Sequence, residues 1–279
     1  MVKYLGLLLL SFSVYIKTYG GNENFPVGAR AAGIGNAAVT LNDMWAAFNN
    51  QAGLSGLKNV NAGAYNEIRY GLKELSLNAF AVAVPVKKIG TFSLSATYFG
   101  FNLYNEQKIG LAYARNFGDN ISAGIQFDYI ATNLSDEYYG RQDAFTVEAG
   151  FRAELLPGFI LGVHVYNPTR AKLSSYENEK SPSTFKLGLC YHFNEKVLLA
   201  AETEKTSAMK NSIKAGFEYR IAKPLFLRAG ISTNQTSGYF GFGLELKQIK
   251  INFTASFHET LGFTPHTDIS YEFGNQAKE

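Results

Sequence analysis

The feature that most restricts the fold of this chain is a strict alternation of apolar and polar residues, repeated many times after residue 60. Between Ile121 and Tyr129, for example, every odd position is aliphatic or aromatic, while the even positions are Ser, Gly, Gln and Asp. A period of two over about ten residues indicates a β-strand, and it is the length that a tilted strand needs to cross a bilayer. The predicted strands are 60–69, 76–86, 90–101, 107–117, 120–131, 142–154, 158–166, 184–193, 196–204, 211–221, 224–232, 238–246, 249–258 and 266–273.

The number and spacing of these strands favour a membrane barrel. About fourteen strands is an even number, as a single-chain bacterial barrel with both ends in the periplasm requires. Connections after even-numbered strands are tight, whereas those after odd-numbered strands are generally longer, which is typical of periplasmic turns and outer loops. A soluble β-sandwich would have to expose the same apolar face to water. We therefore predict an all-β fold, an outer-membrane antiparallel β-barrel of about 14 strands.

The N-terminal residues 1–20 resemble a secretory signal peptide, with Lys3 before an apolar run and small residues at Thr18 and Gly20. Removing them leaves 24 Lys and Arg against 23 Asp and Glu, because the full chain has 26 basic residues and the leader contains Lys3 and Lys17. This balance gives no reason to expect a nucleic-acid partner. No later apolar run is long enough for a transmembrane helix, and one cysteine, Cys190, cannot form an internal disulfide.

Charged residues fall on the polar face of the predicted strands, which in a barrel faces the lumen. Their signs are mixed, so we expect paired charges that hold a plug rather than a selectivity filter. The predicted lumen charge network comprises Glu148, Arg152, Lys186, Lys214, Glu218, Arg220, Arg228 and Glu245.

Residues 21–57 do not alternate. They contain a glycine-rich stretch, 28–37, and a segment, 42–48, that is expected to form a short helix. The glycines do not fit a nucleotide-binding motif, and no strand precedes them. Because a barrel of fourteen strands is too wide for its own side chains to fill, we predict an N-terminal plug at 21–57, a barrel at 58–274 and a tail at 275–279.

Two stretches of this segment, GARAAGIGNA at 28–37 and WAAFNNQAGL at 45–54, resemble the head of FadL-like outer-membrane proteins. The resemblance is closest to the PorV/PorQ branch of Bacteroidota, whose head reads roughly GARAxGMGGA and then ends in NPAGL. Gln51 departs from this pattern, because the family usually has proline there. The resemblance implies a fourteen-stranded barrel with an N-terminal plug in the outer membrane of a Gram-negative bacterium, with both termini periplasmic.

The resemblance also implies two alternative functions. A PorV/PorQ-like protein would be a non-enzymatic accessory of type IX protein secretion, whose partners are a secretion complex and outer-membrane lipid. A FadL-like protein would be a passive transporter of hydrophobic small molecules, fatty acids or aromatics, that leave sideways through a break in the wall. The residues expected to line the plug or a ligand pocket are Phe25, Arg30, Ile34, Met44, Trp45, Phe48 and Asn50. The third predicted strand, 90–101, contains no proline and no obvious break.

The sequence gives little support for a metal site, a cofactor site or a catalytic site. None of the four histidines has metal-ligand spacing, and no cofactor is implied. Ser256 and His258 lie on one strand face, as a hydrolase pair would, but no carboxylate can be assigned to orient the histidine. We therefore expect neither a catalytic site nor a metal site.

Overall fold

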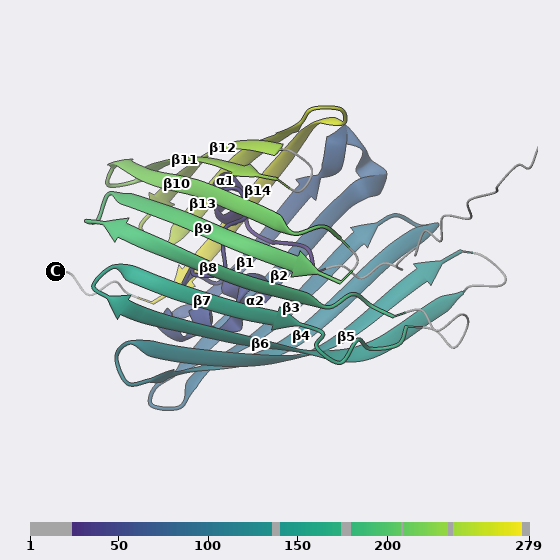
Figure 1. Cartoon of the computed structure of the whole chain (residues 1–279), viewed down its shortest axis with the longest axis horizontal. Helices are drawn as coiled ribbons and strands as arrows, with labels where there is room; N and C mark the ends of the chain where they lie inside the picture. The colour runs from purple at the N-terminus through teal and green to yellow at the C-terminus, as the bar shows by residue number, and fades with distance from the viewer. Residues whose placement is uncertain (1–23, 136–139, 174–179, 208, 234–236, 275–279) are drawn as a thin grey trace, which may run out of the picture.

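The computed structural model describes residues 24–135, 140–173, 180–207, 209–233 and 237–274. Fourteen strands form a closed antiparallel barrel, in which consecutive strands pair and β1 closes on β14 (Figure 1). The strands are β1 (Val60–Ile68), β2 (Ser76–Val86), β3 (Gly90–Gly100), β4 (Tyr104–Phe117), β5 (Ile121–Leu134), β6 (Arg141–Leu156), β7 (Phe159–Tyr166), β8 (Thr184–Phe193), β9 (Val197–Thr206), β10 (Ser212–Ala222), β11 (Leu225–Ser232), β12 (Ser237–Leu246), β13 (Ile249–His258) and β14 (Gly262–Phe273). The predicted signal peptide and C-terminal tail lie outside the described residues.

The barrel of fourteen strands predicted from the sequence is confirmed, and most strand boundaries agree closely. The main differences are the starts of β4 and β14, which begin at Tyr104 and Gly262 rather than at 107 and 266, and the end of β5, which is Leu134 rather than 131. The connections 101–103 and 259–261 are therefore as short as the turn at 87–89, and the expectation of a longer loop is wrong at both places. Pro265, which lies in the predicted connection 259–265, pairs with Ala255 inside the sheet.

The alternation separates an apolar outer face from a polar lumen. Phe127 is 61% exposed, whereas its neighbours Gln126 and Asp128 are each 1% exposed. Large exposed side chains follow the same parity on other strands, among them Phe80, Leu94, Leu111, Phe145, Phe217, Ile231, Phe240 and Ile269. An apolar outer surface of this kind is suited to contact with lipid. No helix among the described residues is both long and apolar enough to span a membrane.

Described residues 24–57, which we call the head segment, lie inside the barrel (Figure 1). The segment contains α1 (Ala29–Gly33), α2 (Ala46–Asn49) and the 3-10 helix η1 (Gln51–Gly56). Helix α1 contacts β11–β14, while η1 contacts β3–β6. The head segment thus extends between different sides of the wall. Two further 3-10 helices, η2 (Arg69–Gly71) and η3 (Lys73–Leu75), belong to the β1–β2 connection.

The helix expected at 42–48 forms later and is shorter, as α2 at Ala46–Asn49. Asp43 Oδ1 accepts the Trp45 backbone N–H at 3.0 Å and so supports the turn before the helix. Asn50 ends α2 because its backbone is extended, with φ −170° and ψ 105°.

Candidate functional site in the barrel lumen

Wall side chains hold the backbone of the head segment. The Ala29 N–H donates to Asp268 Oδ2 at 2.6 Å, and the Ala29 carbonyl accepts from Thr254 Oγ1 at 2.6 Å. Further along, the Val39 N–H donates to Glu202 Oε2 at 2.9 Å. Buried backbone N–H and C=O groups cost free energy when they have no hydrogen-bond partner. Side chains of β9, β13 and β14 provide these partners in place of water.

Asn50, expected near a ligand pocket, has a structural role. Its Nδ2 donates to the carbonyl oxygens of Val39 at 2.6 Å and Phe151 at 3.1 Å. Its Oδ1 accepts the Ala52 N–H at 3.2 Å and caps η1. Asn50 therefore joins two parts of the head segment to β6.

Glycines of the wall make room for the head segment. A Cβ added to Gly216 would lie 2.4 Å from the Ile34 carbonyl oxygen, and one added to Gly230 would lie 2.1 Å from the Gly35 nitrogen. We call the wall glycines that meet residues 34–52 in this way the glycine track: Gly124, Gly150, Gly162, Gly188, Gly216 and Gly230. Glycine inside a strand often indicates close approach of another backbone, and here it lets the head segment lie directly on the sheet.

Arg30 joins α1 to the wall through a buried carboxylate. Its Nε and Nη2 donate to the two oxygens of Glu218 at 2.9 and 2.7 Å, and its Nη1 lies 3.2 Å from Asp43 Oδ2. Arg228 Nε reaches the same carboxylate at 2.5 Å. Burial alone would lower the pKa of the Arg30 guanidinium, but Glu218 and Asp43 more than offset this and raise it. Arg30 is thus an anchor with both ends of its guanidinium occupied.

A second group of charges surrounds Glu148, which is 1% exposed. Lys108 Nζ lies 2.8 Å from Oε1, His164 Nε2 lies 2.8 Å from Oε2, and Gln51 Nε2 donates to Oε2 at 2.7 Å. Gln51 is the residue at which the sequence departs from the family pattern. Its carboxamide gives the head segment a hydrogen bond to Glu148 of β6, which a proline could not make.

The remaining predicted charges form separate groups. Lys214 Nζ bridges Glu202 at 2.9 Å and Glu204 at 2.7 Å, and Lys186 lies 3.9 Å from Glu204. Because carboxylates and ammonium groups alternate here, the group is internally compensated.

Other predicted charges lie towards the rim with the tight turns. Arg220 and Lys250 lie 3.6 and 3.4 Å from Glu245, with side chains about one third exposed. Arg152 Nε donates to the Thr40 carbonyl at 3.0 Å. The structure therefore divides the predicted single network into several groups, each with its own partners.

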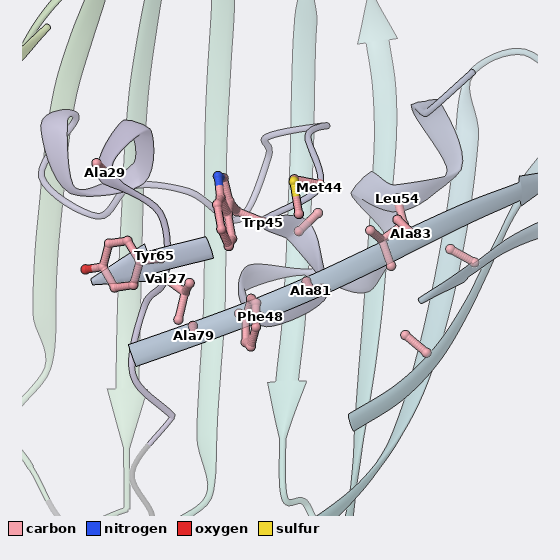
Figure 2. Close-up of a cluster of buried hydrophobic side chains, with 14 of the residues drawn as sticks. Val27, Ala29, Met44, Trp45, Phe48, Leu54, Tyr65, Ala79, Ala81 and Ala83 are labelled. Carbon is pink, nitrogen blue, oxygen red and sulfur yellow. The ribbon is translucent and has the colours of Figure 1, made fainter. Parts of the chain in front are cut away.

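Head-segment side chains also form an apolar cluster with one part of the wall, which we call the apolar sector (Figure 2). Trp45 lies with its ring centroid 6.3 Å from that of Phe48 and 6.2 Å from that of Tyr65. Met44 packs in the same cluster. The wall contributes small side chains in rows from β2 and β4, together with one leucine: Leu77, Ala79, Ala81, Ala83, Ala112 and Ala114.

Two expected ligand-lining residues lie away from this centre. Phe25 packs at the edge of the apolar sector, with its ring 5.2 Å from Phe99 and 4.2 Å below the Arg69 guanidinium. Ile34 belongs to a different cluster, which includes Ile160 of β7. The structure brings Met44, Trp45 and Phe48 together but does not bring Ile34 to them.

The lumen keeps a cavity of about 150 Å³ at the end where odd-numbered strands finish, which we call the mouth cavity. Polar groups predominate in its lining, including Glu67, Arg69, Glu204, Lys214, Ser256, Thr264 and His266. A smaller space of about 20 Å³ borders Phe25, Phe99 and Tyr166 and has room for about one water. The apolar sector is thus packed, and the larger lumen cavity is polar.

Two kinds of lumen residue are absent from the set predicted from the sequence. One is Lys108, which lies on a predicted strand and faces the lumen by parity but is not part of the predicted charge network. The other is the glycine track, even though these glycines occupy inward positions in strand interiors, where a missing side chain leaves space for another backbone.

No protein-family model matches the sequence, and no curated protein matches it. Solved structures do match its shape. The toluene transporter TbuX of Ralstonia pickettii has a TM-score of 0.71 at 12% identity, over 89% of this chain and 98% of that one. The toluene transporter TodX of P. putida has a TM-score of 0.65 at 12% identity, over 91% of this chain and 100% of that one. A FadL homologue of Pseudomonas aeruginosa has a TM-score of 0.64 at 13% identity, over 89% and 98%.

The fold is that of FadL-type outer-membrane barrels. At 12 to 13% identity the likeness concerns the fold. None of these three structures represents the PorV/PorQ branch.

Proposed function

We propose that this chain is a passive transporter of hydrophobic small molecules in the outer membrane of a Gram-negative bacterium. The observation that carries the proposal is the apolar sector. In a lumen whose other walls contain buried ion pairs, Met44, Trp45 and Phe48 face rows of alanine on β2 and β4. An apolar solute avoids desolvating charges only along this side. Transport of this kind requires no bond to be made or broken.

The membrane placement follows from the barrel surface. Val60 at the start of β1 pairs with Phe273 at the end of β14, so the first and last strands meet at one rim. The tight turns lie at the same rim, and in outer-membrane barrels that side is periplasmic. We place the C-terminus there, with the outer apolar face in lipid and residues 21–57 as the plug. The first described residues, Asn24 and Phe25, line the mouth cavity at the opposite end of the barrel.

The route past the head segment is constrained by the wall. Strand β3 pairs without interruption with β2 and β4. The two register shifts, in the β6–β7 and β10–β11 pairs, lie beside tight turns. A groove of about 670 Å³ crosses the outer face of β14 and β1–β4 and borders Tyr65 and Ala79, which also belong to the apolar sector. Sideways exit would therefore need these strands to part near that groove.

The similar structures give independent support. Two of them are described as toluene transporters, and a TodX variant is described as a monoaromatic hydrocarbon channel. By analogy, small aromatic hydrocarbons are the first substrates to try, although a shared fold alone does not fix a substrate.

The test is uptake of the apolar fluorophore N-phenyl-1-naphthylamine by cells that express the chain. Met44→Gln keeps nearly the same volume but places a carboxamide in the apolar sector, so we expect uptake to slow several-fold. Val82→Thr, on the outer face of β2, is the matched control and should leave uptake unchanged.

Hydrolysis of the polar substrate nitrocefin by a periplasmic β-lactamase, measured in the same cells, reports any water-filled channel. Rapid nitrocefin entry without fluorophore uptake would contradict the proposal. Equal fluorophore uptake in cells with and without the chain would also contradict it.

A second candidate is the PorV/PorQ-like role at a protein-secretion complex. The unbroken pairing of β3 favours it, because a docking protein needs no opening in its wall. Native mass spectrometry of the protein extracted in mild detergent separates the two functions. A stable protein partner would support the accessory role, whereas a bound hydrophobic molecule without a protein partner would support transport.

A further inference from the structure

Four polar side chains form a hydrogen-bonded series at the mouth cavity, and all of them except Tyr65 line it. They come from three adjacent strands: Ser256 from β13, His266 from β14, and Tyr65 and Glu67 from β1. His266 Nε2 lies 3.0 Å from Ser256 Oγ, and His266 Nδ1 lies 2.9 Å from the Tyr65 hydroxyl. The Tyr65 hydroxyl in turn donates to Glu67 Oε2 at 2.8 Å.

Glu67, the acceptor at the end of this hydrogen-bonded series, fixes the direction of each hydrogen bond in it. Glu67 is ion-paired with Arg69 Nε at 2.6 Å, and a carboxylate can only accept. The Tyr65 hydroxyl therefore donates its proton to the hydrogen bond with Glu67, and the Tyr65 oxygen accepts a hydrogen bond from His266 Nδ1–H. This assigns the His266 tautomer whose Nε2 lone pair faces the Ser256 hydroxyl. A histidine held in this way can act as a general base towards serine.

The surroundings supply space and hydrogen-bond donors. Ser256, His266 and Thr264 line the mouth cavity, and Thr264 pairs with Ser256 across the two strands. The Thr264 hydroxyl oxygen accepts the Tyr70 N–H at 3.0 Å, which leaves its own proton available to a neighbour. The Arg69 guanidinium also borders the cavity. These groups could stabilise negative charge that develops on a carbonyl oxygen beside Ser256.

His258, which lies on the same strand as Ser256 and two residues after it, has another role. Its Nδ1 accepts the backbone N–H groups of Thr260 and Leu261, each at 3.1 Å, and its ring packs edge-on against Tyr70. His258 therefore supports the β13–β14 turn. The histidine that contacts Ser256 lies ten residues later, on the next strand.

We propose that Ser256 and His266 form a serine-esterase site for small uncharged esters, with Tyr65 and Glu67 as positioning residues. A cavity of about 150 Å³ has the volume of about five waters at roughly 30 Å³ each, which restricts the substrate to a short acyl group and a small alcohol. This activity goes beyond the proposed transport function and does not depend on it.

The reaction proceeds in two balanced steps. Ser256 Oγ bonds to the ester carbonyl carbon as its proton passes to His266 Nε2, and the bond to the alcohol breaks as that oxygen takes the proton from His266. The oxygen of a water molecule then bonds to the acyl carbon as the water gives a proton to His266. The bond between the acyl carbon and Ser256 Oγ breaks as His266 returns that proton to Oγ. The net change is ester plus water to carboxylic acid plus alcohol.

The test is labelling of the folded full-length protein in detergent with a fluorophosphonate, read by mass spectrometry of its peptides. We expect an adduct on Ser256 that is absent in Ser256→Ala. His266→Gln should slow labelling by about 100-fold or more, the usual contribution of a general base. Ser212→Ala is the matched control, because Ser212 lines the same cavity but its hydroxyl faces that of Ser232 at 3.3 Å.

Tyr65→Phe tests the positioning role, since it removes the acceptor of His266 Nδ1–H. The pH profile of labelling should shift in this variant, which a merely structural tyrosine would not produce. An unmodified Ser256 in protein that retains the gel mobility of a folded barrel would overturn the proposal. Equal labelling of Ser212 and Ser256 would overturn it as well. Neither result would bear on uptake of hydrophobic molecules.

Discussion

The glycine track predicts that one added methyl group will loosen the head segment. In Gly230→Ala the new Cβ would begin 2.1 Å from the Gly35 nitrogen, and ordinary van der Waals contact starts at about 3.4 Å. The obstructing atoms belong to backbone, so no side chain can rotate away. The Gly35 region must therefore move by about 1.3 Å, the difference between these two distances.

That displacement is large enough to affect the ion pair beside it. If α1 moves with Gly35 by the same 1.3 Å, the distance between Arg30 Nη2 and Glu218 Oε1 increases from 2.7 Å to about 4.0 Å. Overpacking typically costs about 1–3 kcal/mol, and the weakened buried ion pair adds to this. We expect attachment of the head segment to lose about 3 kcal/mol, which corresponds to a factor of roughly 150 in its equilibrium.

Trp45 provides a direct assay, because it is the only tryptophan in the chain, belongs to the head segment and is 3% exposed. In urea, its emission should shift to the red at a lower concentration in Gly230→Ala than in the wild type. Barrel unfolding, followed by gel mobility, should change less. Gly238→Ala is the control, since a Cβ there meets nothing within 4 Å. An unchanged Trp45 transition in Gly230→Ala would refute the packing argument.

Three further predictions concern the lumen and the outer face. Glu218→Gln removes the carboxylate that the buried Arg228 shares with the partly buried Arg30, and should lower the free energy of unfolding by about 3–5 kcal/mol, measured in urea. Gln51→Pro suits the first position of η1 but removes the donor to Glu148, so the Trp45 transition should show a loss of about 1–3 kcal/mol. Phe127→Arg places a charge midway along β5 and should cost about 2–4 kcal/mol in refolding into vesicles, whereas Phe117→Arg at the end of β4 should cost about 1 kcal/mol or less.

Much of the architecture was predictable because it depends on local patterns. The period of two identified fourteen strands and the face that each turns to the lumen, as Phe127 and Gln126 illustrate. The starts of β4 and β14 were missed because polar residues and Pro265 favour a turn when considered alone. In the barrel these residues pair with a neighbouring strand, and that pairing outweighs their local preference.

The sequence by itself determined the strand number, the polarity of the two faces and the presence of a non-alternating head, since each is written in the spacing of neighbouring residues. Only the tertiary structure decided which groups meet. Arg30 and Glu218 are 188 positions apart in the sequence. Ser256 contacts His266 rather than His258, although His258 is nearer in the sequence. Closure of the sheet sets these distances, because side chains from strands remote in sequence converge on one lumen.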